Sequence, residues 1–220
     1  MFGGEKTDTF GFLLPAAGTR RKMTRTVLRT TRIVFWLLFP MAVFIVVGAL
    51  QAWDSGRAKV MQEKHLSMSD TLNLRWHYTP KDVETFWGRL GHDGMGAERR
   101  FLEEDLTFPT FYGGAFVLSL LSLLTLAGRT WSRWVLVLPV AIGVAGDWIE
   151  NLTQLNQLHV FMAGGPLNSD AIARSSVATD AKLAGVIVST LLLIALSRIA
   201  QQRPEVPESS SELSQLGHRR

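Results

Sequence analysis

The sequence contains no cysteine among its 220 residues. This absence excludes disulfide bonds, thiol redox chemistry and thiolate metal sites. Several catalytic and nucleotide-binding signatures are also missing: there is no G-x-S-x-G element, no H-E-x-x-H element, no phosphate-binding loop and no dinucleotide fingerprint. No internal repeat is present, which argues against a transporter built from inverted repeats. These absences remove several common classes of protein and leave the function to be argued from other features.

Charged residues are rare in four long stretches of the chain, and these stretches predict membrane spans. A membrane helix needs about 20 mostly apolar residues to cross a hydrocarbon core of about 30 Å. We predict spans at about residues 33–53, 108–128, 131–152 and 183–200, and therefore an all-α fold, a four-transmembrane-helix bundle. A cleaved signal peptide does not explain the first run, because the run is too long and lacks a small-x-small cleavage site.

Basic residues border the spans unevenly, and their distribution predicts the orientation. They precede the first span, occupy the short connection between the second and third spans, and follow the fourth span: Arg20, Arg21, Lys22, Arg25, Arg29 and Arg32; Arg129 and Arg133; Arg198, Arg203, Arg219 and Arg220. We therefore expect a multi-pass protein of the inner (plasma) membrane with both termini in the cytoplasm. The pI of about 9.8 fits attraction of the basic N-terminal segment to anionic lipids of the bilayer. No nucleic-acid partner is predicted, because the basic residues border the spans and do not line a groove with interleaved aromatic residues.

The chain divides into three parts on this prediction. Residues 1–32 form a basic cytoplasmic extension, in which either Met1 or Met23 is the start of translation. Residues 33–200 form the membrane domain, and residues 201–220 form a cytoplasmic tail that its composition predicts to be disordered. Within the membrane domain, the external loop 54–107 is too long for a bare loop and is expected to contain helices.

The segment YTPKDVETFWGRLG predicts a short helix in this external loop. Thr79 is its N-cap, Pro80 takes the first helical position and Gly91 ends it. Its apolar residues share one helix face at i, i+3, i+4 and i+7: Val83, Phe86, Trp87 and Leu90. We expect this helix to form a cap on the bilayer surface or on the neighbouring helix ends. A flexible turn at GHDGMG and a second helical stretch at AERRFLEEDL are expected to follow.

The segment GDWIENLTQL places polar side chains at the end of the third apolar run. Asp147, Glu150 and Asn151 stand at i, i+3 and i+4, and Gln154 follows at i+7, so all four share one helix face. The charge-free part of the run covers only about 18 Å. A helix that crosses the membrane must therefore carry Asp147 about one turn inside the outer boundary, where an ionisable group usually faces the bundle interior.

Three interpretations of this constellation stay open: a solvated helix end, a buried polar network that orders the bundle, or a site for a ligand, an ion or a reaction. Asp105 and Tyr112 are expected nearby, at the outer end of the antiparallel second span. We predict that Arg99 or Arg100 supplies a cation to the carboxylates by a bidentate contact. The outer histidines have no metal-ligand spacing, so no metal or cofactor is predicted: His65, His77, His92 and His159.

Parts of the sequence resemble a family of uncharacterised small integral membrane proteins, mostly bacterial. The matching pieces are YTPKDV with RLGHDG, ERRFLEEDLTFPTFYGG and LVLPVAIGVAGDWIENL, and they cover roughly residues 78–155. The features that match the family pattern are Asp105, Phe108-Pro109-Tyr112, Pro139, and Asp147 with Glu150 and Asn151. Phe101 departs from the pattern, in which a tyrosine is common. The resemblance implies a shared site at the matching residues and no particular reaction.

Two functions of different classes are compatible with these features. We favour a non-enzymatic membrane protein whose outer polar cluster orders the bundle and supports a protein partner, a homo-oligomer or a small ligand. The alternative is a membrane enzyme that acts on a lipid or another amphiphile at the outer surface, with Asp147 or Glu150 as the base. Substrate would then be oriented by Asn151, Tyr112 and Arg99 or Arg100. An ion-coupled carrier would need oligomerisation, because four spans enclose little pathway.

Overall fold

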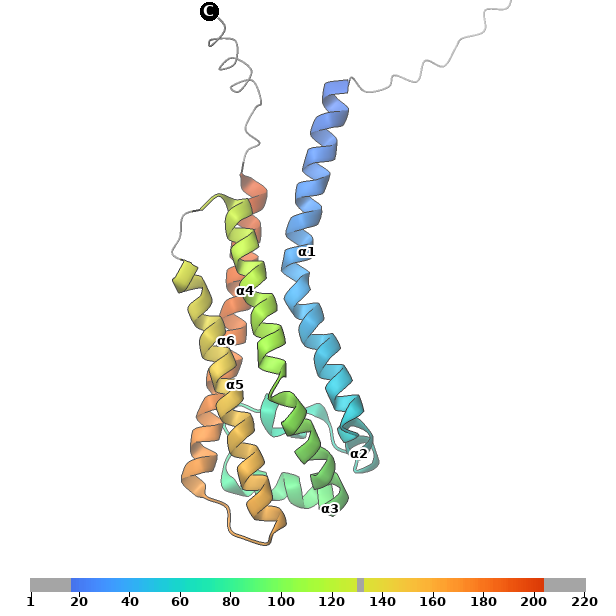
Figure 1. Cartoon of the computed structure of the whole chain (residues 1–220), viewed down its shortest axis with the longest axis vertical. Helices are drawn as coiled ribbons and strands as arrows, with labels where there is room; N and C mark the ends of the chain where they lie inside the picture. The colour runs from blue at the N-terminus through green and yellow to red at the C-terminus, as the bar shows by residue number, and fades with distance from the viewer. Residues whose placement is uncertain (1–16, 130–132, 204–220) are drawn as a thin grey trace, which may run out of the picture.

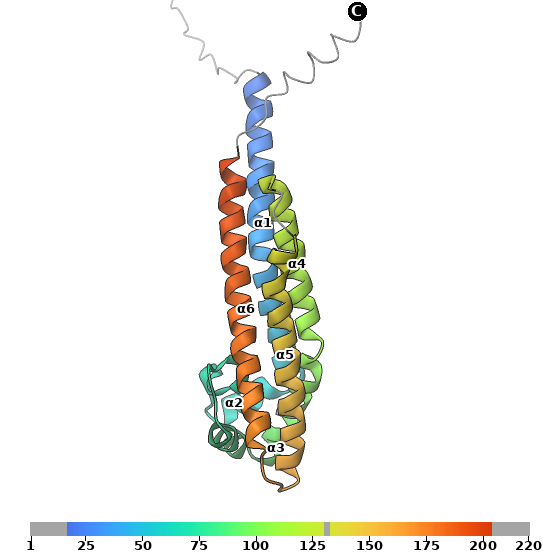
Figure 2. The ribbon, with the colours of Figure 1, turned by 90° about the vertical axis from the view of Figure 1, so that its left-hand side faces the viewer.

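The computed structural model describes residues 17–129 and 133–203, and every regular element among them is helical. The α-helices are α1 (Ala17–Asp54), α2 (Arg57–Glu63), α3 (Pro80–Asp105), α4 (Phe108–Ala127), α5 (Arg133–Met162) and α6 (Ser169–Gln202). Two short 3-10 helices, η1 (Met68–Asp70) and η2 (Leu72–Leu74), lie between α2 and α3. The four helices α1, α4, α5 and α6, which we call the bundle helices, run along one axis, and α2 and α3 gather at one end of them (Figures 1 and 2).

Four stretches are long and apolar enough to cross a membrane: Thr26–Asp54, Pro80–Ala127, Arg133–Met162 and Ser169–Gln202. The prediction of an all-α fold with four such helices is confirmed. Three helices are longer than the predicted spans, because the first begins at Ala17, the third runs to Met162 and the fourth begins at Ser169. Apolar content marks only the part suited to hydrocarbon, whereas a helix continues wherever its polar part finds packing partners. Met1 and most of the predicted tail lie outside the described residues.

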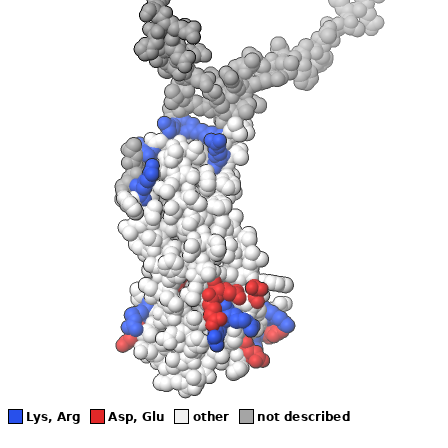
Figure 3. Space-filling view, in the orientation of Figure 1, with Lys and Arg blue, Asp and Glu red and all other residues white. Residues whose placement is uncertain are grey.

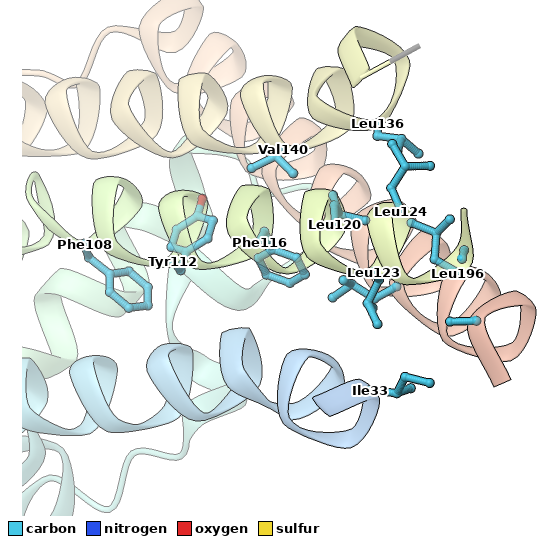
Figure 4. Packing of buried hydrophobic residues seen from close by; sticks show 13 residues of the cluster. Ile33, Phe108, Tyr112, Phe116, Leu120, Leu123, Leu124, Leu136, Val140 and Leu196 are labelled. Atoms are coloured by element: carbon cyan, nitrogen blue, oxygen red, sulfur yellow. The ribbon is translucent and has the colours of Figure 1, made fainter. Parts of the chain in front are cut away.

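The molecule contains two hydrophobic cores at different levels along its axis. The first, which we call the long core, packs α4 against α1, α5 and α6 (Figure 4): Ile33, Phe108, Tyr112, Phe116, Leu120, Leu123, Leu124, Ala127, Leu136, Val140, Leu193, Leu196 and Ala200. The second, the α3 core, joins α2, η2 and α3 to the adjoining ends of α5 and α6: Met61, Leu66, Leu72, Tyr78, Val83, Phe86, Trp87, Leu90, Leu102, Leu158 and Ile172. We call the elements around this second core the α3 unit.

The start of α3 follows the predicted capping pattern. The Thr79 hydroxyl accepts a hydrogen bond from the Asp82 N–H, and the Asp82 carboxylate accepts one from the Thr79 N–H at 2.8 Å. The prediction of a flexible turn at GHDGMG is wrong. Only Gly91 leaves the helical conformation, at φ 69°, and the helix continues directly after it. Gly94 is helical and lets α2 pack closely against α3, because a Cβ there would lie 2.9 Å from Val60 Cγ1 of α2.

Helices α5 and α6 approach each other closely through glycines. A Cβ on Gly146 of α5 would lie 2.6 Å from the Ala178 carbonyl oxygen, and a Cβ on Gly185 of α6 would lie 2.6 Å from the Pro139 carbonyl oxygen. Small residues of this kind let two helix backbones meet directly. The close approach brings the polar face of α5 onto the first half of α6.

Charged side chains gather at the two ends of the molecule and leave an uncharged band between them (Figure 3). At the end opposite to α3, Arg29 donates to the main-chain oxygens of Ala200 at 2.5 Å and Arg203 at 2.7 Å, and so caps the C-terminus of α6. The band itself exposes large apolar side chains on all four bundle helices: Phe35, Leu38, Ile45, Leu118, Leu138, Ile142, Ile187 and Leu191.

Candidate functional site

A layer of buried polar side chains lies between the two hydrophobic cores. Helices α3, α4, α5 and α6 each contribute to it, and none of its members is more than 8% exposed. We call it the polar layer: Asp105, Tyr112, Asp147, Glu150, Asn151, Gln154 and Lys182. All the predicted site residues except the two arginines are therefore in one layer, together with one residue that was not predicted.

Lys182 of α6 supplies the cation of the polar layer. Its Nζ lies 2.5 Å from Glu150 Oε2 and 3.2 Å from Asp147 Oδ1, and both carboxylates belong to α5. An ion buried away from water is tolerated when it is paired and hydrogen-bonded, and this ammonium is held by two carboxylates at once. The contact ties α6 to α5 at the level where the two cores meet.

Asn151 connects α5 to the end of α3. Its Nδ2 donates to Asp105 Oδ2 at 3.0 Å, to the Asp105 main-chain oxygen at 3.3 Å and to Asp147 Oδ1 at 3.3 Å. The indole N–H of Trp148 donates to the Leu106 main-chain oxygen at 2.9 Å. Polar contacts from α5 therefore hold the short junction between α3 and α4.

Gln154 and Tyr78 extend the polar contacts to the loop that precedes α3. Gln154 Nε2 donates to Glu150 Oε1 at 3.0 Å and to the Tyr78 hydroxyl at 3.1 Å. The Tyr78 hydroxyl donates to Ser175 Oγ at 2.7 Å, and the Tyr78 N–H donates to Ser176 Oγ at 2.9 Å. These bonds fix both the side chain and the backbone of Tyr78 against α6.

Tyr78 is expected to ionise only at a higher pH than an ordinary tyrosine. Burial raises the pKa of Tyr78, and the negative charge of Glu150 raises it further. The chain has two tyrosines, so tyrosinate absorbance of a Tyr112→Phe variant reports Tyr78 alone. The folded variant should titrate at higher pH than the denatured one. Because the folded state keeps a proton that the unfolded chain releases, stability should fall as pH rises through about 10. Coincident titration curves would contradict this expectation.

The prediction that Arg99 or Arg100 supplies the cation is wrong. Arg99 pairs with Glu103 on its own helix at 2.8 Å, at an exposed position. Arg100 Nε donates to the Ser55 main-chain oxygen at 3.3 Å, toward the end of α1. Each helical residue turns the side-chain direction by about 100°. The two arginines are five and six positions before Asp105, and they therefore lie well off its face.

Lys182 was missed because the predicted fourth span began just after it. The helix in fact begins at Ser169, and its first half carries Ser175, Thr179 and Lys182 at i, i+4 and i+7, on one face. All three side chains are buried against α5 and Tyr78. This spacing is the signal in the sequence that would have identified the lysine.

Phe101, the position that departs from the family pattern, lies beside a second buried ion pair. Arg57 of α2 pairs with Glu98 of α3 at 2.7 Å, and its guanidinium lies 3.9 Å from the centre of the Phe101 ring. A phenyl face is attractive to a cation. The aromatic ring at this position therefore packs against Arg57 and does not contribute a polar group to the polar layer.

The histidines considered for a metal site do not join the carboxyl groups of the polar layer. His77 is 84% exposed and binds Asp180 through Nδ1 at 2.6 Å, and His92 is 87% exposed beside Asp93. Within residues 17–129 and 133–203, no group of three or more His, Asp or Glu residues is arranged to hold a metal ion. The polar layer consists of carboxyl, amide and ammonium groups and the Tyr112 hydroxyl.

Comparison with known proteins adds no assignment, since no family model, curated protein or solved structure matches the chain. The function must therefore be argued from the geometry of the polar layer and from its position between the two cores.

Proposed function

We propose that the chain is a multi-pass protein of the inner (plasma) membrane whose polar layer anchors the α3 unit at the outer end of the bundle. The bridge from Lys182 to Asp147 and Glu150, continued by Asn151 to Asp105, carries the proposal. It joins α6, α5 and α3 at one buried level. The anchored α3 unit is then the part that presents a surface to a protein partner.

The dimensions of α4 support this position in the membrane. Its 20 residues, Phe108–Ala127, contain no charged side chain and cover about 30 Å, the thickness of a hydrocarbon core. Asp105 is the last residue of α3 and precedes the first residue of α4, so the polar layer lies at one boundary of the hydrocarbon. Arginines gather at the other boundary, which supports a cytoplasmic location for both termini and an external location for the α3 unit.

The energetics of buried charge explain how such a layer anchors the unit. Sliding α6 along α5 by one turn would take Lys182 away from Asp147 and Glu150, and tilting α3 would separate Asp105 from Asn151. Each movement leaves a polar group without a partner next to hydrocarbon, which costs several kcal/mol for a charge. Apolar contacts alone tolerate such movements more easily, because they are not directional. The layer therefore selects one arrangement of the helices.

The burial of the carboxylates favours anchoring over catalysis. Glu150 is 0% and Asp147 is 2% exposed, and the side chains of neighbouring helices enclose both. A lipid-modifying enzyme would need one of these carboxylates to reach its substrate. We therefore assign them a structural role and no reaction.

The proposal is tested by cysteine labelling of whole cells with a membrane-impermeant maleimide, since the native chain has no cysteine. Asp93→Cys, at an exposed position of α3, should be labelled, and Gln201→Cys, at the other end, should not. Ala97→Cys, at a position 1% exposed in the α3 unit, should be protected. Adding Asp147→Ala, Glu150→Ala and Asn151→Ala together should make Ala97→Cys reactive.

The matched control adds Arg99→Ala in place of the triple substitution. This change removes an exposed ion pair on the same helix, which is worth about 0.3–0.5 kcal/mol, and should leave Ala97→Cys protected. Labelling of Gln201→Cys in intact cells would overturn the orientation. Protection of Ala97→Cys in the triple variant would overturn the anchoring role.

A further inference from the structure

We infer that the polar layer binds a proton, held by the Asp105 and Asp147 carboxyls beside the Asn151 amide. The inference rests on the proposed function, because it names the ligand of the same layer. Two observations carry it: the balance of charge and a buried amide oxygen without a hydrogen-bond partner.

The balance of charge is the first observation. The titratable groups that interact with the two carboxyls are Tyr112 of α4, Glu150 of α5, Lys182 of α6 and Arg57 of α2. Arg57 of α2 is the next cation, and it is already paired with Glu98 at 2.7 Å. Three carboxylates would therefore face one ammonium, and two negative charges would stay uncompensated where charge is most costly. A bound proton removes one of them.

The second observation is that a buried oxygen of the layer, Asn151 Oδ1, has no hydrogen-bond partner. Asn151 is 0% exposed, and its Nδ2 already reaches Asp105 Oδ2 and Asp147 Oδ1. Its oxygen can only accept, and an ionised carboxylate cannot donate to it, whereas a protonated carboxyl can. A proton on Asp105 or Asp147 thus supplies a donor that the neighbouring amide lacks.

Infrared spectroscopy of the full chain in detergent tests the inference, because a protonated carboxyl has a carbonyl stretch separate from that of a carboxylate. At neutral pH the parent should show this band. Asp105→Asn and Asp147→Asn should each abolish it, since each leaves two carboxylates with Lys182, the same net charge as the protonated parent. Glu98→Gln is the matched control, because Glu98 is a buried carboxyl with its own cation, and it should leave the band unchanged.

Thermal unfolding against pH provides a second measurement. A proton that the folded protein holds and the unfolded chain releases makes stability fall as pH rises. The parent should therefore lose stability as pH rises above about 4, where an ordinary aspartate ionises, and Asp105→Asn should show a flatter dependence. Absence of the carbonyl band from the parent, or its persistence in both Asn variants, would overturn the inference. Stabilisation of the parent by sodium ions without the band would assign the counter-charge to a cation instead.

The two proposals fail in different ways. If the parent lacks the carbonyl band while Ala97→Cys is still protected from the maleimide, proton binding is overturned and anchoring of the α3 unit stays in place. If the parent shows the carbonyl band while Ala97→Cys stays protected in the triple variant, anchoring is overturned and proton binding stays in place.

Discussion

Replacement of Lys182 by methionine is expected to destabilise the bundle by about 3–5 kcal/mol, the usual effect of removing one partner from a buried ion pair. Methionine is about as long as the lysine stem, so the change removes the charge and little volume. Asp147 and Glu150 would then face each other without a cation, at positions 2% and 0% exposed. Unfolding by denaturant in mixed micelles measures the effect.

The cause of this loss can be isolated by removing the carboxylates as well. Lys182→Met combined with Asp147→Asn and Glu150→Gln should recover a large part of the stability, because neutral amides need no cation and retain hydrogen-bonding groups. The loss in Lys182→Met should also shrink at acidic pH, where the carboxyls can take up protons. A Lys182→Met variant as stable as the parent would show that the contacts at 2.5 and 3.2 Å contribute nothing to stability.

Replacement of Gly146 by alanine is expected to cost about 3 kcal/mol, the upper end of the usual range for overpacking. The added Cβ would lie 2.6 Å from the Ala178 carbonyl oxygen and 3.0 Å from the main-chain nitrogen of Lys182. Both are backbone atoms of α6, which cannot rotate away as a side chain can. The helices must therefore separate, and separation also draws Lys182 away from Asp147. Gly185→Ala should act in the same way, since its Cβ would meet the Pro139 carbonyl oxygen at 2.6 Å.

Gly114 in α4 offers the matched control for these substitutions. A Cβ at Gly114 would have no neighbour within 4 Å. Alanine is also favoured over glycine inside a helix by about 1 kcal/mol, so Gly114→Ala should be neutral or slightly stabilising. The same unfolding measurement applies to all three variants. Equal stabilities for Gly146→Ala and Gly114→Ala would contradict the close packing of α5 on α6.

Several features of the fold could be predicted because they depend on residues close together in the chain. The four apolar runs identify the helices that can cross a membrane, and the Thr79–Asp82 pair identifies the start of α3. The positions of Asp147, Glu150, Asn151 and Gln154 on one face follow from helical periodicity alone. The predicted helix ends were less accurate, since α5 and α6 continue beyond their apolar parts to build the α3 core.

The composition of the polar layer depended on contacts between distant segments. The sequence by itself determined that carboxylates and an amide share one face near the end of an apolar run, since local spacing sets that face. Only the tertiary structure decided that their cation is Lys182, which is 35 positions from Asp147, and not Arg99 or Arg100. The choice depends on how α6 is rotated and how deep it lies against α5. Both are set by the contacts at Gly146 and Gly185, which no local pattern of residues specifies.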